Sequence, residues 1–393
     1  MAACRRVSAA ALAALATVVA SALIAAAPAA AATLTCQLSS PSVVFGTTVT
    51  VTGVVDPAVE AQEVVVTLAG VDVGTALTAA DGTFSFAFAP ARGGDVAARL
   101  SADGSVSAPS PLVVKPAIAV GHGALVPFLN TRFALDVEPA SYTGDVVARV
   151  FHRGRRVATV RGRCVDGRAV LRVPLRGIDW FTVRFELAPT AELGPGAAKR
   201  SVKLEWRRLG VGSRGARVRG VLTQLRRLRV VVPGIGETYT SAVADAVVAF
   251  QKAYRLPRTY VLSYDDWRKL DGAARVRPRY GSPARHLEID RARQIVMVVD
   301  DGSVLGVVAV STGATGNTPV GAFRILRKNP ASATWDGSVA LPRFMTFYGN
   351  MGLHGYPIVP PYPASHGCVR EPLWACDWVY DRSFVGERLF IYQ

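Results

Sequence analysis

The sequence predicts a β-rich multidomain protein with two β-sandwich modules, a small three-helix module and a mostly β C-terminal domain. Its 393 residues are enough for about two to four domains at roughly 100–200 residues each. Apolar and polar residues alternate in short runs through residues 33–203, which is typical of half-buried strands. Apolar residues then recur at helical spacing through residues 204–272, and strand patterns return in residues 284–393.

Residues 1–32 have the layout of a secretory signal peptide. Arg5 and Arg6 form a positive start, an apolar run extends from Ala9 to about Ala27, and small residues at its end offer cleavage sites. A retained membrane anchor is the alternative, although the Ala-rich run is only marginally hydrophobic for a spanning helix. We therefore expect an exported protein, in the periplasm or cell wall at the outer face of the cytoplasmic membrane.

The chain is strongly basic, with 45 Lys and Arg against 29 Asp and Glu and a formal net charge of +16. A field of this sign attracts anionic partners. Because export separates the protein from nucleic acid, we expect anionic wall polymers rather than nucleic acid as partners, and we expect a monomer. An oxidising location permits disulfides, so a bridge between Cys36 and Cys164 stays open.

Residues 33–115 and 116–203 each predict a β-sandwich. In the first, Thr and Val alternate near its start, and Asp81-Gly82 supplies a turn between two further strand patterns. The stretch 80–86 resembles those of bacterial immunoglobulin-like modules. Neither sequence contains a cluster of reactive side chains, so we interpret both modules as spacers rather than binding modules.

Residues 204–272 predict three short helices, with Thr240 or Ser241 capping the second. The stretches 209–218 and 246–256 resemble the two signatures of the three-helix peptidoglycan-binding domain. This resemblance implies binding to the bacterial wall. The alternative, that the fold is kept without glycan binding, stays open.

The C-terminal domain, residues 284–393, carries strand patterns and two compact motifs. We expect its strands at 286–290, 293–299, 304–311 and 344–347. The motifs are Gly352-Leu353-His354-Gly355 and Ser365-His366-Gly367-Cys368-Val369-Arg370. Four prolines between the two motifs predict an irregular loop with a restricted backbone.

The two motifs contain the residue types that acyl transfer needs. A cysteine is strongly nucleophilic only as the thiolate, so Cys368 requires a base, and His354 or His366 can take its proton. Gly355 and Gly367 permit close backbone approach. We expect the amides of Gly367 and Cys368 to point toward a developing oxyanion, where each such donor contributes about 3–4 kcal/mol.

These motifs resemble the L,D-transpeptidase catalytic domain, together with Ser311-Thr312-Gly313 and the Thr-Pro-x-Gly-x-Phe segment that ends at Phe323. The resemblance covers the whole C-terminal domain. It implies that Cys368 is the nucleophile, that His354 is the general base, and that Gly355 orients the imidazole through its backbone carbonyl. It also implies that four further residues shape the substrate and oxyanion site: Ser365, His366, Gly367 and Arg370.

The same resemblance implies a reaction in wall biogenesis and cell shape. Cys368 attacks the third residue of a peptidoglycan stem tetrapeptide, releases D-Ala, and passes the acyl group to the side-chain amine of another stem. It implies acylation by carbapenem-type β-lactams and no metal ion or cofactor. An L,D-carboxypeptidase and a non-catalytic wall-binding protein are the alternatives. The motifs leave open whether the acceptor is a stem amine, water or a protein lysine.

A zinc site built from His354, His366 and Cys368 is an interpretation from a different class of enzyme. It lacks an evident fourth ligand at metal spacing. A disulfide between Cys368 and Cys376 is another alternative, which would remove the nucleophile.

Overall fold

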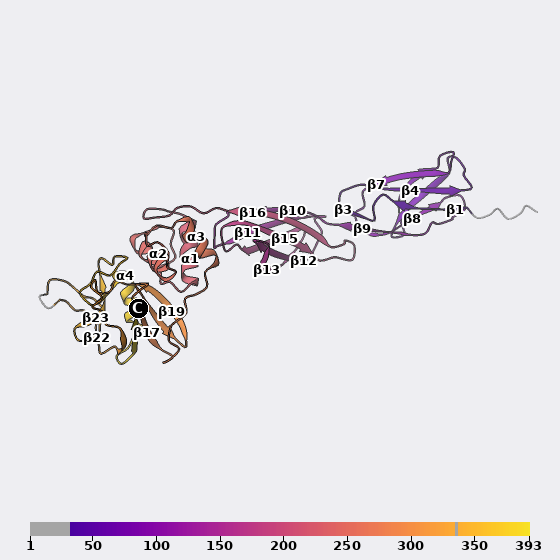
Figure 1. Cartoon of the computed structure of the whole chain (residues 1–393). Helices are drawn as coiled ribbons and strands as arrows, with labels where there is room; N and C mark the ends of the chain where they lie inside the picture. The colour runs from indigo at the N-terminus through magenta and orange to yellow at the C-terminus, as the bar shows by residue number, and fades with distance from the viewer. Residues whose placement is uncertain (1–31, 335–336) are drawn as a thin grey trace, which may run out of the picture. The chain divides into compact units, whose positions relative to one another are not determined.

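The computed structural model describes residues 32–334 and 337–393, which divide into two compact units (Figure 1). The first unit contains the described residues up to Pro41, Thr48–Ala89 and Gly94–Leu112, and the second contains Ser42–Thr47, Pro90–Gly93 and Val113–Gln393. The predicted signal segment lies outside the described residues except for Ala32. No helix in the described part of the chain is long and apolar enough to cross a membrane.

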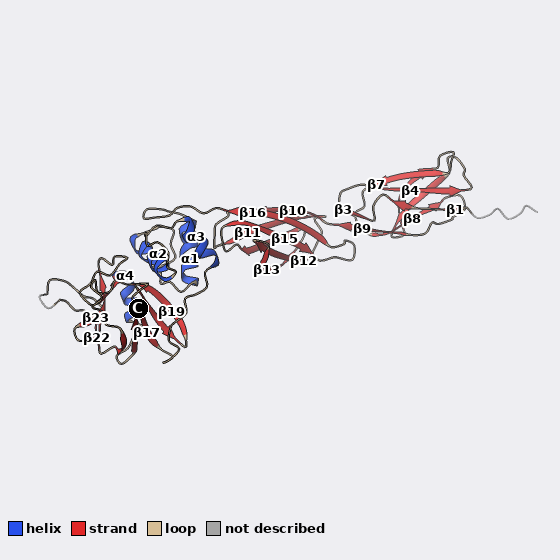
Figure 2. Cartoon of the chain, in the orientation of Figure 1, coloured by secondary structure: helices blue, strands red, loops and turns tan. Residues whose placement is uncertain are grey.

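The first unit is formed by strands (Figure 2). Strand β4 pairs with β1, β2 and β7 in one sheet, and β9-β8-β5-β6 is the order in another. Alternate residues of these strands, such as Val49, Val51 and Phe84, are buried and form the core. The strands are β1 (Thr33–Leu34), β2 (Gln37–Leu38), β4 (Val49–Asp56), β5 (Glu63–Leu68), β6 (Val71–Leu77), β7 (Thr83–Phe88), β8 (Gly94–Leu100) and β9 (Ser110–Lys115).

The second unit begins with two packed sheets, in the orders β10-β11-β14 and β13-β12-β15-β16. Their inner faces meet around Phe133 and Phe185, whose ring centroids are 5.6 Å apart. β3 (Ser42–Val44) pairs in parallel with the end of β9 in this unit. The other strands are β10 (Ala117–His122), β11 (Asn130–Glu138), β12 (Gly144–His152), β13 (Arg155–Cys164), β14 (Arg168–Pro174), β15 (Asp179–Leu187) and β16 (Gly196–Leu204).

The helical module consists of α1 (Ala216–Arg227), α2 (Ser241–Ala253) and α3 (Tyr264–Gly272). Thr240 caps α2, because its side chain accepts a hydrogen bond from the Val243 amide. The apolar face of the helices surrounds Trp267, and the same buried cluster includes Phe128 and Ile178 from the preceding module. The ring of Phe128 stacks on Trp267 at 5.7 Å. The helices therefore share a core with their neighbour instead of closing one alone.

The C-terminal domain contains two sheets, in the orders β19-β18-β17-β25-β20 and β21-β22-β23-β24, with α4 against the second. An apolar cluster that includes Leu287, Val298, Leu353 and Val369 joins the two sheets. The elements are β17 (His286–Asp290), β18 (Ile295–Asp300), β19 (Ser303–Ala309), β20 (Gly321–Arg324), β21 (Arg327–Asn329), β22 (Phe344–Tyr348), β23 (Met351–Tyr356), β24 (Val369–Pro372), α4 (Leu373–Tyr380) and β25 (Arg388–Tyr392).

Two strand boundaries in the C-terminal domain differ from the prediction by two residues. The predicted strand at 293–299 begins instead at Ile295, because the Gln294 amide donates to the Asp290 carbonyl and closes a turn. The predicted strand at 304–311 ends at Ala309. The chain beyond it leaves the sheet, and Ser311 pairs with Arg370 instead. This extension connects the first sheet to the segment that carries Cys368.

Candidate active site

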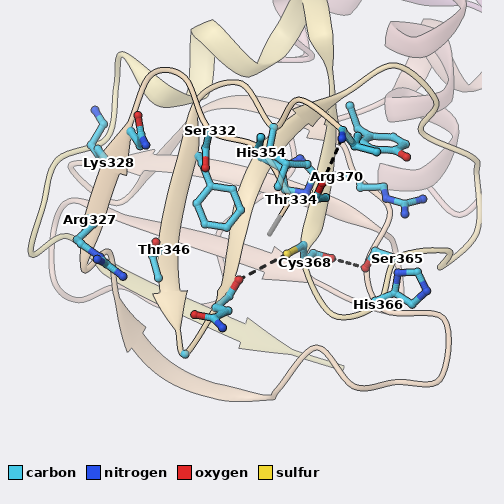
Figure 3. Close-up of a pocket in the computed structure, with 18 residues that line it drawn as sticks. Arg327, Lys328, Ser332, Thr334, Thr346, His354, Ser365, His366, Cys368 and Arg370 are labelled. Carbon is cyan, nitrogen blue, oxygen red and sulfur yellow. Dashed lines mark hydrogen bonds between the residues drawn. The ribbon is translucent and has the colours of Figure 1, made fainter. Parts of the chain in front are cut away.

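The two predicted motifs meet at a cavity of about 870 Å³ (Figure 3). His354, Ser365, His366, Cys368 and Arg370 all line it. The predicted residues Gly355 and Gly367 belong to the backbone behind these side chains and do not line the cavity. Parallel pairing of β23 with β24 places His354 opposite Arg370, so residues distant in the sequence reach one wall.

His354 lies in the middle of β23 and is buried. Its Nδ1 is 2.9 Å from the Gly355 carbonyl oxygen, and because a carbonyl only accepts, Nδ1 carries the proton. In the neutral ring Nε2 is then the free base. The Phe344 ring stacks on the imidazole at 5.6 Å. Burial lowers the pKa of His354, the Gly355 carbonyl raises it, and the Arg370 cation lowers it.

Cys368 is partly exposed at the entrance to β24, with Sγ 4.0 Å from the Asn350 carbonyl oxygen. Burial raises the pKa of the thiol, while a hydrogen bond from the Gly352 backbone and the Arg370 cation lower it. In Figure 3 the His366 ring points away from the Cys368 sulfur, past Ser365. Both histidines line the cavity, and His366 is the one whose ring is turned away from Cys368.

The turn before Cys368 is held by several hydrogen bonds. The Thr318 hydroxyl donates to the Gly367 carbonyl at 2.7 Å, and the Asn317 side-chain amide donates to the His366 carbonyl at 2.5 Å. The Ser365 hydroxyl donates to the Cys368 carbonyl at 2.5 Å. Gly367 has a φ of 139°, which favours glycine. These contacts give Ser365 and Gly367 a part in shaping the turn.

One predicted feature of this turn is wrong. The Gly367 amide does not point freely into the cavity, because it donates to the Ser365 hydroxyl oxygen at 3.1 Å. The Cys368 amide makes no hydrogen bond to any residue that the structure describes. It is therefore the backbone donor beside the sulfur that remains available for an oxyanion.

Comparisons with known proteins indicate the family of the C-terminal domain. Residues 284–391 match the model of the L,D-transpeptidase catalytic domain (YkuD). The chain is 32% identical to a crystallised L,D-transpeptidase of Xylanimonas cellulosilytica, over 48% of this chain and 98% of that one, with a TM-score of 0.45. The chain belongs to the L,D-transpeptidase family.

Other L,D-transpeptidases of known structure are less similar in sequence. The one from Stackebrandtia nassauensis is 20% identical over 47% of this chain and 95% of its own, with a TM-score of 0.32. The one from Mycobacterium smegmatis is 13% identical over 70% of this chain and all of its own, with a TM-score of 0.26. A search of curated proteins gives no match.

In this member of the L,D-transpeptidase family the electrostatics favour a neutral thiol and a neutral imidazole. The pKa of the Cys368 thiol is raised and that of His354 is lowered, in both cases chiefly by burial. A neutral imidazole can accept the thiol proton as the sulfur attacks, which is the arrangement that general-base catalysis requires. Arg370 lies over the Tyr356 ring at 4.2 Å and keeps a positive charge beside both groups.

The sequence did not reveal part of the cavity wall. A hairpin closes one side, where the Thr334 amide donates to the Val339 carbonyl and the Leu341 amide to the Ser332 carbonyl. Lys328 also lines the wall, but its ammonium donates to the Tyr380 and Ser383 carbonyls at 2.6 Å. No sequence signal marks this hairpin, because hydrogen bonds between backbone groups define it.

The structure also bears on the alternatives that involve cysteine and zinc. Cys36, Cys164, Cys368 and Cys376 are all free thiols in the described part of the chain. The described residues contain no group of three or more His, Cys, Asp or Glu side chains placed to hold a metal ion.

Proposed function

We propose that this protein is a peptidoglycan L,D-transpeptidase with Cys368 as nucleophile and His354 as general base. The observation that carries the proposal is the fixed tautomer of His354, whose Nδ1 proton is held by the Gly355 carbonyl in the cavity that Cys368 lines. Membership of the family supports the substrate class, a stem peptide of peptidoglycan.

In the first half of the proposed reaction, His354 Nε2 accepts the thiol proton as Sγ attacks the carbonyl carbon of the third stem residue. The oxyanion is stabilised by the Cys368 amide and the Arg370 cation. The carbon–nitrogen bond to the terminal D-Ala then breaks, and the leaving amine takes the proton from His354. A thioester remains on Cys368.

In the second half, the side-chain amine of another stem attacks the thioester. His354 accepts a proton from that amine, the carbon–sulfur bond breaks, and the thiolate recovers the proton. Water in place of the amine would give an L,D-carboxypeptidase. The positive field of the chain supports a second proposal, that anionic wall polymers concentrate the enzyme at its substrate.

The test is intact-mass spectrometry of the protein with a stem tetrapeptide and, separately, with a carbapenem. We expect a covalent adduct on Cys368 that is absent in Cys368→Ala. Cys376→Ala is the matched control, because Cys376 is a buried thiol whose pKa burial raises to about 11. An adduct-free protein with both compounds would refute the proposal. The products released from the peptide separate transfer from hydrolysis.

We further propose that residues 1–32 direct export and are removed. Cell fractionation followed by N-terminal sequencing tests this. Recovery of the protein in the cytoplasm with its first residues intact would refute it.

A further inference from the structure

The loop between the two catalytic motifs, residues 357–364, has no regular secondary structure. It must nevertheless connect two parallel strands, β23 and β24, and such connections are usually made by a helix. Four of its residues are prolines, which have no amide proton to donate. Its backbone carbonyls therefore need donors from elsewhere in the molecule.

Two of those donors come from the helical module. The Arg258 guanidinium donates to the Pro361 carbonyl at 2.7 Å, and the Tyr260 hydroxyl donates to the Val359 carbonyl at 3.1 Å. A third donor, the Ser311 hydroxyl, reaches the Tyr362 carbonyl at 2.8 Å from the extension of β19. Side chains outside the loop thus bind three of its carbonyls in close succession.

Arg258 does more than bind the loop. Its other terminal nitrogen donates to the Ala292 carbonyl at 3.0 Å and to the Arg293 carbonyl at 3.3 Å. These two residues form the turn between β17 and β18. One planar cation therefore ties the loop to the first sheet, and a guanidinium is suited to this because its donors lie in a fixed fork.

Lys252 binds the extension of β19, which in turn contacts the other end of the loop. It is fully buried on α2, and its ammonium donates to the Val310 carbonyl at 2.8 Å. Burial lowers its pKa to about 7. Two residues further on, the Thr312 carbonyl accepts from the Ala364 amide at 2.9 Å and from the Ser365 amide at 3.1 Å. The extension of β19 that contains Val310 and Thr312 therefore connects Lys252 to the segment that contains Cys368.

The helical module also packs against the first sheet of the C-terminal domain. Its buried cluster includes Ala309, at the end of β19. Ala253 of α2 is buried with residues of β18 and β19 in a second cluster. The segment after α1 also pairs with β19, since the Val231 amide donates to the Val307 carbonyl and the Val307 amide to the Arg229 carbonyl.

We propose that Arg258, Tyr260 and Lys252 of the helical module are positioning residues for acyl transfer at Cys368. They hold the loop and the β19 extension so that the strand with His354 and the turn with Cys368 keep their register. The inference rests on the proposed function, because it concerns the rate at which Cys368 is acylated. The helical module resembles a wall-binding domain, and the inference gives it a second role, which is to position residues of the catalytic site. Misplacement of a catalytic group by about 1 Å costs on the order of 100-fold in rate.

The test compares acylation rates of full-chain variants, measured by intact mass with a carbapenem and by kcat and KM with a stem tetrapeptide. We expect Arg258→Gln to lower kcat about tenfold or more with KM changed less than twofold, and Arg258→Lys to recover part of the loss. Tyr260→Phe removes one hydroxyl only, so it keeps the fold, and we expect about a threefold lower acylation rate. Lys252→Met should act in the same direction as Arg258→Gln.

Arg268→Gln is the matched control, because Arg268 is exposed on α3 and its cation lies over Tyr264, away from the loop. Equal acylation by wild type, Arg258→Gln and Tyr260→Phe would overturn the inference while leaving the proposed function intact. So would variants that lose binding to isolated wall but keep wild-type acylation. A wild-type protein that is never acylated would overturn the proposed function itself, and the inference with it.

Discussion

The second β-sandwich and the C-terminal domain use the same kind of strand in two different ways. In β14 the exposed and buried residues alternate strictly, and the polar positions face water. In β17 all five residues are buried, although polar residues alternate with apolar ones there too. Glu288 of that strand accepts hydrogen bonds from the Arg279 and Tyr280 amides and from the Tyr392 hydroxyl.

The difference in burial between the two strands depends on whether one face or both faces of the sheet are covered by other elements. One face of the sandwich sheet is open, so its polar side chains are solvated and contribute little to stability. Both faces of the C-terminal sheet are covered at β17, so the polar side chains of this strand need partners inside the protein. We therefore expect changes at the turn and the base of the C-terminal site to alter the acylation rate, and changes in the sandwich to alter stability alone.

The largest expected effect is on the acylation rate, and it should distinguish two glycines with positive φ. Gly367 lies in the C-terminal domain and Gly154 lies in the second sandwich. Gly367 has a φ of 139°, and a Cβ there would lie 2.7 Å from Met351 Cε, whereas Gly154 has a φ of 76° with nothing within 4 Å. We expect Gly367→Ala to slow acylation about 100-fold, because it shifts the turn that carries Cys368. Gly154→Ala should keep the wild-type rate. Equal rates for both variants would contradict this difference.

The second expected effect is on the pH dependence of the acylation rate. Because burial lowers the pKa of His354 below its ordinary value of 6.5, the neutral base should persist at pH values somewhat below 6.5. We expect the acylation rate to fall only below that value, by about tenfold per pH unit. Arg370→Gln removes a cation that lowers the same pKa, so the acidic limb should move to higher pH. A wild-type acylation rate that already falls with decreasing pH above 6.5 would contradict this prediction.

A smaller effect is expected from Glu371, whose carboxylate is buried without a hydrogen-bond partner among the described residues. Burial raises its pKa to about 8 from the usual 4.5. Between these two pKa values the folded state keeps a proton on Glu371 that the unfolded state has lost. The contribution of this group to the free energy of unfolding is therefore fully present below pH 4.5 and is lost as the pH rises through about 8.

Glu371→Gln should remove this decline. Above pH 8 we expect its melting temperature to exceed that of wild type by about 5 °C, with a much smaller difference below pH 4.5. Thermal denaturation at both pH values measures this, and the acylation rate should change less than twofold. A wild-type melting temperature that does not decline relative to the variant would show that Glu371 is not protonated in the fold.

The smallest effect on acylation is expected from the sandwich core. Phe185→Ala leaves a cavity beside Phe133 and should cost about 3–5 kcal/mol of unfolding free energy. At temperatures where the variant stays folded, its acylation rate should equal that of wild type. Val170→Ala is the control, since Val170 is 54% exposed and its loss should change neither quantity. A slower rate in Phe185→Ala would show that the sandwich supports the catalytic domain.

The sequence predicted which motif residues line the cavity more accurately than it predicted the strand ends. His354 and Cys368 are recognisable because few other side chains perform nucleophilic acyl transfer, and the motifs around them are short and contiguous. The hydrogen bond from the Gly367 amide to the Ser365 hydroxyl was not predictable, because it depends on the rotamer of Ser365. The hairpin that closes the cavity was missed for a similar reason, since hydrogen bonds between its own backbone groups define it.

By itself, the sequence determined the order of β and helical segments and predicted Cys368 and His354 as the reactive pair, because strand period, helix period and nucleophile chemistry are local properties. Tertiary structure alone decided which donors hold the loop between His354 and Cys368. Arg258 is about a hundred residues from the Pro361 carbonyl that it binds, and nothing near it in the chain indicates that partner. A carbonyl in a proline-rich loop has no local donor, so only the folded chain can supply one.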